Sequence, residues 1–247
     1  MGLNFSKMKK HCNLHIVTYN YNNNNSNLSN NILVNFINNF LNKDVIICIQ
    51  NINYNFKINK LNNFYSENLK LLILTNLDIL KKEYHIYDSN NYNLLNKNLY
   101  GFQHLKLCYN KIKLNIYNTG IIPDEIQQID FDIIRETQVK ELFDYICNSN
   151  NRIHLVIGSF YDYQNNIKEL INISEINNLI TNFNNNKQES YIFVYTKNIV
   201  NNIDNINDYL KSKYHMRLVN HKIYNLEIDE YCPFEVILKI EKLNIII

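Results

Sequence analysis

Short runs of consecutive apolar residues organise this chain, and polar loops rich in asparagine separate them. Runs of this length and continuity are typical of strands that are covered on both faces. A tight turn at residues 110–112 separates two of these runs, which indicates a hairpin. The pattern predicts strands at residues 14–20, 44–50, 69–76, 104–109, 113–119, 152–158, 191–196, 217–226 and 234–240.

Other segments carry apolar residues at helical spacing and predict helices at residues 28–42, 132–147 and 166–180. Ser29 is the candidate cap of the first helix. The apolar positions of the first two helices are Leu33, Phe36, Ile37, Phe40 and Leu41, then Ile133, Ile134, Val139, Leu142, Phe143 and Ile146. Many strands with interspersed helices and no Pro/Gly linker predict one α/β (α+β) domain with mixed sheets over residues 13–247. Residues 1–12 are predicted to form a flexible tail.

The nearly equal numbers of basic and acidic residues limit the kinds of ligand that this protein is expected to bind. The chain has 25 basic and 23 acidic residues, for a net charge of +2. Because no strong basic cluster lies outside the N-terminus, we expect no nucleic-acid ligand. The five cysteines show no CxxC spacing, which favours reduced thiols in a cytoplasmic compartment.

The N-terminus matches the pattern for N-myristoylation. In MGLNFSK, Gly2 becomes the first residue after removal of the methionine, and Ser6 occupies the hydroxyl position. One myristoyl chain binds a membrane only marginally, so a second signal is expected. Candidate second signals are Lys7, Lys9, Lys10 and Cys12. The sequence therefore predicts a lipidated tail that attaches the protein to a cytosolic membrane face.

Eight short motifs, in order along residues 13 to 240, resemble those of one enzyme superfamily. They are VTYN (17–20), DVIICIQN (44–51), LKLLILTN (69–76), NTGI (118–121), Arg135/Gln138/Leu142, GSFY (158–161), ESYIFV (189–194) and DEYCPF (229–234). Together they resemble the endonuclease/exonuclease/phosphatase superfamily of deoxyribonuclease I, nearest its neutral sphingomyelinase-like branch. The resemblance implies two mixed sheets packed face to face with helices on both outer faces, a four-layer sandwich.

The resemblance also implies where a phosphodiesterase site would lie. Family members bind a divalent metal, usually magnesium, through a Glu and an Asp, activate water with another Asp, and hold phosphate with Asn and His residues. In this chain Asn20 is kept. The other positions are substituted: Asn51 for Glu, Gly120 for His, Ser159 for Asp, Tyr161 for Asn, Ser190 for Asp, Glu230 for Asp and Tyr231 for His. The substitutions predict a degenerate site, in which we assign no catalytic residue and expect no cofactor.

Three functions stay open at this stage. The first is an inactive homologue that serves as a membrane-tethered binding or scaffold module for an unknown protein partner. The second is an active magnesium-dependent phosphodiesterase of the sphingomyelinase type, less readily a nuclease, with the metal on Asn20 and Glu230. The third is a self-associating structural block. A slipped alignment would bring in Asp162 or Asp229, whereas we interpret four histidines as structural: His15, His154, His215 and His221.

Overall fold

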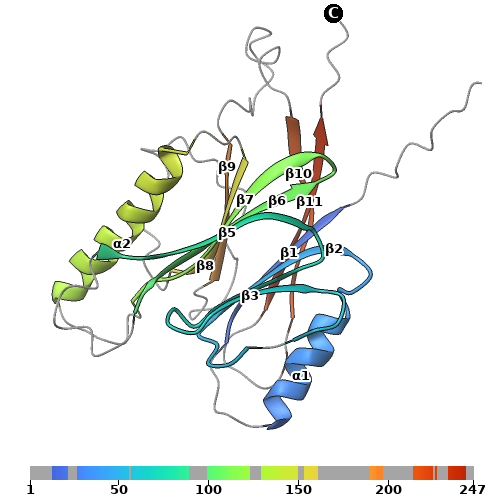
Figure 1. Cartoon of the computed structure of the whole chain (residues 1–247), viewed down its shortest axis with the longest axis horizontal. Helices are drawn as coiled ribbons and strands as arrows, with labels where there is room; N and C mark the ends of the chain where they lie inside the picture. Colours follow the sequence, from blue (N-terminus) through green and yellow to red (C-terminus); the bar gives the residue numbers. More distant parts are fainter. Residues whose placement is uncertain are drawn as a thin grey trace, which may run out of the picture.

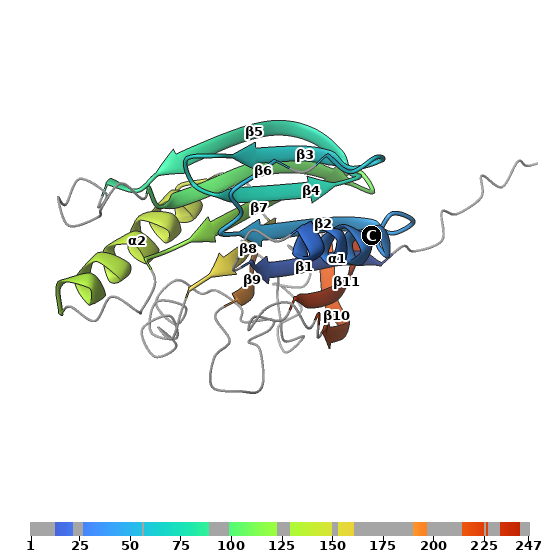
Figure 2. The ribbon, with the colours of Figure 1, turned by 90° about the horizontal axis from the view of Figure 1, so that it is seen from below.

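The computed structural model describes residues 13–21, 27–55, 57–88, 99–122, 129–149, 153–160, 190–196, 214–224, 226 and 233–242. Within these residues the strands form two mixed sheets that pack face to face (Figures 1 and 2). This arrangement confirms the predicted fold class. The predicted helix at 166–180 lies outside the described residues.

The first sheet has six strands in the order β10-β11-β1-β2-β4-β3. Its strands are β1 (Leu14–Asn20), β2 (Asp44–Gln50), β3 (Asn62–Ser66), β4 (Leu71–Thr75), β10 (Tyr214–Ile223) and β11 (Phe234–Lys242). Strands β1 and β2 are parallel, with Leu14 opposite Asp44 and Asn20 opposite Gln50. Strand β11 pairs with the other edge of β1 in the antiparallel sense, so the chain's last strand lies beside its first.

The second sheet has five strands in the order β5-β6-β7-β8-β9. Its strands are β5 (Asp78–Ile86), β6 (Gly101–Tyr109), β7 (Ile112–Gly120), β8 (Ile153–Ser159) and β9 (Ser190–Thr196). Strands β7 and β8 are parallel, and the other neighbours are antiparallel. The sequence pattern missed β3 and β5. Both are edge strands with mixed polar and apolar residues, so neither produces a continuous apolar run.

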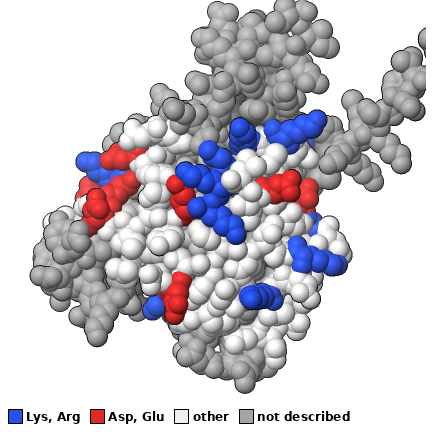
Figure 3. Space-filling view, viewed as in Figure 1, with Lys and Arg blue, Asp and Glu red and all other residues white. Residues whose placement is uncertain are grey.

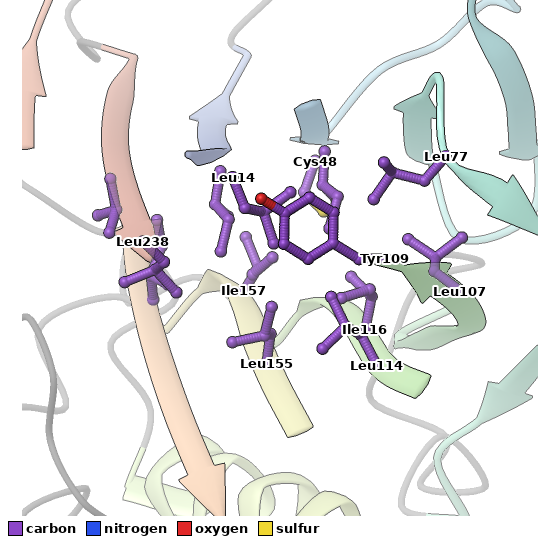
Figure 4. Close-up of a cluster of buried hydrophobic side chains, with 14 of the residues drawn as sticks. Leu14, Cys48, Leu77, Leu107, Tyr109, Leu114, Ile116, Leu155, Ile157 and Leu238 are labelled. Carbon is purple, nitrogen blue, oxygen red and sulfur yellow. The ribbon is translucent and has the colours of Figure 1, made fainter. Parts of the chain in front are cut away.

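The core between the sheets is built from alternate residues of the apolar strands. Because successive side chains of a strand point to opposite faces, one set faces the partner sheet and the other faces outward. Figure 4 shows side chains from both sheets meeting in this layer. Its buried members include Leu14, Cys48, Leu107, Leu155 and Leu238. The runs look continuous in sequence because both of their faces are buried.

In the described part of the chain, one helix covers each outer face. Helix α1 (Asn27–Asn38) packs its Leu33, Phe36 and Ile37 against the outer side of the six-stranded sheet. Helix α2 (Ile129–Cys147) packs its Val139, Leu142, Phe143 and Ile146 against the outer side of the five-stranded sheet. The four layers implied by the resemblance are therefore present (Figure 2).

Two details of the helix predictions are wrong. Ser29 does not cap the first helix, because α1 begins two residues earlier, at Asn27. Ile133 does not share the buried face of α2, since 61% of it is exposed, while the neighbouring Ile134 is buried. The helical spacing placed Ile133 at the edge of a broad apolar face of the helix. In the structure that edge of the face is exposed to solvent.

The sandwich has two distinguishable ends. We call the end where β1, β2, β7 and β8 finish the site end, marked by Asn20, Gly120 and Ser159. The opposite end, where β1 begins and the β6–β7 hairpin turns, is the tail end, marked by Leu14 and Tyr109. Figure 4 shows the Tyr109 ring beside Leu14, and in Figures 1 and 2 the start of β1 and the β6–β7 turn lie on the same side.

Candidate functional site

Four strands end side by side at the site end and bring the predicted site residues together. Asn20 is the last residue of β1, Gly120 of β7 and Ser159 of β8, and Asn51 follows β2. In the register of the second sheet, Gly120 lies opposite Ser159, and Ser159 lies opposite Ser190, the first residue of β9. The parallel directions of β1/β2 and β7/β8 place their carboxyl ends at one edge.

Asn20 and Asn51 form a pair of uncharged amides. The Asn51 Nδ2 donates a hydrogen bond to Asn20 Oδ1 at 2.5 Å. Asn20 is buried and Asn51 is exposed, and Asn51 has a φ of 59°. Asparagine tolerates this left-handed conformation better than most residues, which helps to explain an amide at this position. The pair leaves the Asn20 oxygen engaged by a neighbouring side chain.

Beneath this pair, a chain of buried amides joins the two sheets. Gln50 Nε2 donates to Asn118 Oδ1 at 2.8 Å, and Thr18 Oγ1 donates to Gln50 Oε1 at 3.4 Å. Asn118 Nδ2 in turn lies 3.2 Å from Gln103 Oε1. It also lies within hydrogen-bonding distance of two backbone oxygens in the opposite sheet, those of Ile49 and Leu72. Gln50, Gln103 and Asn118 are fully buried.

This network was not predicted as a unit, although Gln50 and Asn118 lie within two of the motifs. The available signal was a polar residue at an inward-facing position of an otherwise apolar strand. Buried polar groups are costly unless hydrogen-bonded, so such residues are usually partnered. Pairing across two sheets cannot be deduced from a single strand, because the partner strands are distant in sequence.

Gly120 occupies the position where the resemblance implies a histidine, and the local space does not require glycine. An added Cβ would come no closer than 3.9 Å to another atom, the Leu71 Cδ2. Among the glycines described in the structure, none has a positive φ, so the backbone does not require glycine here either. The structure thus leaves room beside Gly120 at the site end.

Ser159 is fully buried, and its Oγ atom has no hydrogen-bond partner among the residues that the structure describes. An unsatisfied buried hydroxyl costs about 1–3 kcal/mol relative to a hydrated one. The strand places this side chain on the inward face, in line with the core residue Ile157. Serine thus presents a short neutral hydroxyl at the position where the resemblance implies an aspartate.

The helix motif supports the chain that leaves the site. Gln138 Oε1 accepts a hydrogen bond from the backbone N–H of Ile122 at 3.1 Å, two residues after Gly120. Arg135 is buried and forms an ion pair with Asp132 of the same helix. Leu142 is fully buried between α2 and the sheet. Gln138 and Leu142 therefore fix α2 against the sheet, whereas the Arg135 ion pair lies within the helix.

The described site residues do not fit magnesium. Magnesium sites in proteins normally include one or two carboxylates. Asn20, Asn51, Gly120 and Ser159 supply none, and the Asn20 oxygen already accepts from Asn51. Across the described part of the chain, there is no cluster of three or more His, Cys, Asp or Glu side chains arranged to hold a metal.

Several predicted positions lie outside the described residues or have undescribed side chains. Outside them are Gly2, Lys7, Lys9, Lys10, Cys12, Tyr161, Asp162, Asp229, Glu230 and Tyr231. Ser190 is placed through its backbone pairing alone. The metal pair Asn20/Glu230 implied by the active alternative is therefore placed for Asn20 only.

Of the four histidines that we interpreted as structural from the sequence, His15 and His154 lie on outer faces of the sheets, away from the site end. His154 Nδ1 lies 3.1 Å from the Tyr117 hydroxyl under α2. His15 Nδ1 lies 2.5 Å from Glu235 Oε1, and the Tyr224 hydroxyl also donates to Glu235. Burial raises the pKa of Glu235, but these hydrogen bonds outweigh it and bring the pKa below its ordinary value. His221 is exposed on β10, which also contains His215.

A second group of histidines under α2 was not predicted. His104 stacks on Tyr117, with ring centroids 4.6 Å apart, and its Nε2 lies 3.2 Å from Asn115 Oδ1. His85 stacks on Phe102 at 4.8 Å. Burial lowers the pKa of both histidines below the ordinary 6.5. These groups lie on the outer face of the five-stranded sheet, so they do not contribute to the site.

Comparison with solved structures shows the fold. A humanised TDP2 of D. rerio matches with a TM-score of 0.61 at 9% identity, over 92% of this chain and 98% of that one. SmcL matches with a TM-score of 0.60 at 12% identity, over 91% and 98%. An endonuclease/exonuclease/phosphatase family protein from Leptotrichia buccalis C-1013-b matches with a TM-score of 0.61 at 12% identity, over 92% and 99%.

No family model matches the sequence, and no curated protein matches it. At such low identities the structural likeness shows the fold alone. The chain thus has the deoxyribonuclease I-like fold of the endonuclease/exonuclease/phosphatase superfamily, as its motifs predicted.

Proposed function

We propose that this chain, which has the deoxyribonuclease I-like fold, is a catalytically inactive homologue of the superfamily's metal-dependent phosphodiesterases. It acts as a binding or scaffold module attached to a cytosolic membrane face. The observation that supports inactivity is the set of neutral residues at the site end. Asn51, Gly120 and Ser159 stand where the resemblance implies a glutamate, a histidine and an aspartate.

The loss of charge at the site end supports the proposal that metal-dependent chemistry is absent. At about 4 Å and an effective dielectric near 20, each carboxylate attracts a cation by about 4 kcal/mol per unit charge. Asn51 and Ser159 forfeit two such contributions. Removing one general acid or base typically lowers a rate about 10²- to 10⁴-fold, and here an aspartate and a histidine are replaced together. One substitution would be compatible with a variant mechanism, whereas this combination favours an inactive site.

The retained framework explains why such a fold would persist. The buried amides still join the two sheets, and Gln138 still anchors the chain after β7. Loops on a rigid scaffold are the usual place for binding residues, so the site end offers a rim for a protein partner. Attachment to a membrane is supported by the MGLNFSK pattern. None of the helices in the described residues is long and apolar enough to cross a membrane.

Calorimetric titration of the full chain with magnesium and manganese tests the inactive-site proposal. The wild type is expected to show no saturable binding. Asn51→Asp restores one carboxylate beside Asn20 and is expected to raise the affinity. Asn110→Asp is the matched control, because Asn110 is also exposed with a left-handed φ of 49° but lies at the tail end. Saturable binding by the wild type would overturn the proposal and support the active alternative.

A further inference from the structure

A compact group of lysines lies on the β6–β7 hairpin at the tail end. The hairpin closes through Asn110 and Lys111, whose φ angles of 49° and 66° are both left-handed. Tyr109 lies opposite Ile112, so this is a two-residue turn of the kind that fits twisted strands. Lys111 is exposed and is part of the turn itself, so the tight turn fixes the position of its backbone at the tip of the hairpin.

Two further lysines flank the turn on one face of the sheet. Lys113 lies opposite Cys108, and Lys106 lies opposite Asn115. Because residues 113 and 115 are two apart on one strand, Lys106 and Lys113 project from the same face. This is the outer face, on which Lys113 is exposed and Lys106 is half-buried beside the region that α2 covers. We call Lys106, Lys111 and Lys113 the hairpin lysines.

The hairpin lysines carry charge that nearby acids do not neutralise. Lys81 on the adjacent strand pairs with Glu83 at 2.6 Å, whereas the hairpin lysines form no ion pair within the described residues. Asp78 is the acidic residue nearest in register, opposite Cys108. Leu80, at the irregularity where β5 shifts register, is 50% exposed nearby. Figure 3, which has β5 across its front, shows Lys and Arg side chains over the centre and upper part of that side of the molecule, with Asp and Glu side chains beside them.

The N-terminal segment joins the sandwich at this same end. Residues 1–12 directly precede β1, whose first residue, Leu14, lies beside Tyr109 of the hairpin (Figure 4). Twelve residues reach at most about 40 Å when extended, enough for a lipid on Gly2 to insert beside the hairpin. The chain therefore enters β1 at the same end of the sandwich as the hairpin lysines.

We propose that the hairpin lysines bind the phosphate groups of an anionic membrane surface and turn the site end away from it. This inference rests on the proposed membrane attachment and specifies its second signal. A single acyl chain attaches a protein only marginally, and each lysine near an anionic leaflet strengthens partitioning about fivefold. Three hairpin lysines thus convert a weak anchor into a stable, oriented one. The site end then faces the cytosol, where a protein partner can reach it.

Vesicle co-sedimentation of the full chain tests this proposal. Myristoylated and unmodified protein are each mixed with phosphatidylcholine vesicles and with phosphatidylcholine/phosphatidylserine vesicles, at low and high salt. The double variant Lys111→Asn/Lys113→Gln removes two charges, and asparagine suits the left-handed turn position. The control Lys70→Asn/Lys140→Gln also removes two lysines, one of them with a left-handed φ of 52°. Lys70 lies at the site end, and Lys140 lies on the exposed face of α2.

The unmodified wild type is expected to bind only the phosphatidylserine vesicles, and high salt should abolish that binding. The hairpin variant should bind about 25-fold more weakly, while the control variant binds like the wild type. Equal losses in both variants would overturn the proposal, because they indicate a non-specific charge effect. If Gly2 does not accept myristate but the hairpin variant still binds more weakly than the wild type, the proposed lipid anchor is wrong and the membrane-binding role of the hairpin lysines stands.

Discussion

Replacing Asn118 should destabilise the protein by removing the centre of the amide network between the sheets. In Asn118→Ala, the buried Gln50 Nε2 loses its acceptor and the buried Gln103 Oε1 loses a donor. Gln103 Nε2 keeps its bonds to the backbone oxygens of Phe64 and Leu71, and Gln50 Oε1 keeps Thr18. Two buried polar atoms are therefore left unsatisfied.

Each such atom costs about 1–3 kcal/mol, so we expect the free energy of unfolding to fall by about 3–4 kcal/mol. Asn118→Asp should cost at least as much. Its carboxylate would face the oxygens of Gln103, Ile49 and Leu72, to which the native amide donates. An aspartate therefore cannot replace the asparagine, although it has nearly the same shape.

Urea unfolding followed by circular dichroism measures these changes, with Asn53→Ala as the control, because Asn53 is an exposed loop residue without a left-handed φ. A double-mutant cycle with Gln103→Ala should give a coupling energy of about 1 kcal/mol or more between Asn118 and Gln103. A loss below about 1 kcal/mol in Asn118→Ala, or no coupling, would refute the view that this network joins the sheets.

Three further predictions concern the Ser159 hydroxyl, the histidines under α2 and the N-terminal glycine. Ser159→Ala should raise the free energy of unfolding by about 1 kcal/mol, because it removes a buried unsatisfied hydroxyl; destabilisation in urea would instead indicate a hydroxyl partner. The lowered pKa values of His85 and His104 mean that the folded state disfavours their protonation, so stability should fall as the pH drops below about 6.5, measured by urea midpoints. His104→Gln should flatten that dependence, and an unchanged profile would contradict the assignment. Gly2→Ala should abolish incorporation of myristate during co-expression with N-myristoyltransferase, and persistent labelling would contradict the predicted lipidation site.

The sequence was most informative where strands are buried on both faces. All nine predicted strands are present, and most of them are buried on both faces, which leaves no polar alternation to obscure the run; β10 is the exception, an edge strand exposed at residues 219–223. Edge strands β3 and β5 were missed, since exposed edges permit residues such as Lys81, Lys82 and Glu83. Helix margins were misjudged for a related reason: spacing alone does not tell how far the neighbouring sheet extends, so Ile133 was expected to be buried.

The resemblance named Asn20, Asn51, Gly120 and Ser159 as site positions, and the strand directions place them at one edge of the sandwich. The bond between Asn51 and Asn20 and the isolation of the Ser159 hydroxyl depend on the backbone register and on side-chain direction. Single-strand patterns do not contain that information. The histidines under α2 were missed because their partners lie on β5, β6, β7 and α2, far apart in sequence.

An assay for phosphodiester hydrolysis by the wild-type chain tests the central claim most directly. Purified protein would be incubated with sphingomyelin vesicles and with plasmid DNA, each with magnesium or manganese, beside an Asn20→Ala variant. Our account predicts no release of phosphocholine and no DNA cleavage above the level of the variant. Metal-dependent turnover that Asn20→Ala abolishes would contradict it, and would mean that carboxylates elsewhere in the chain complete a working site.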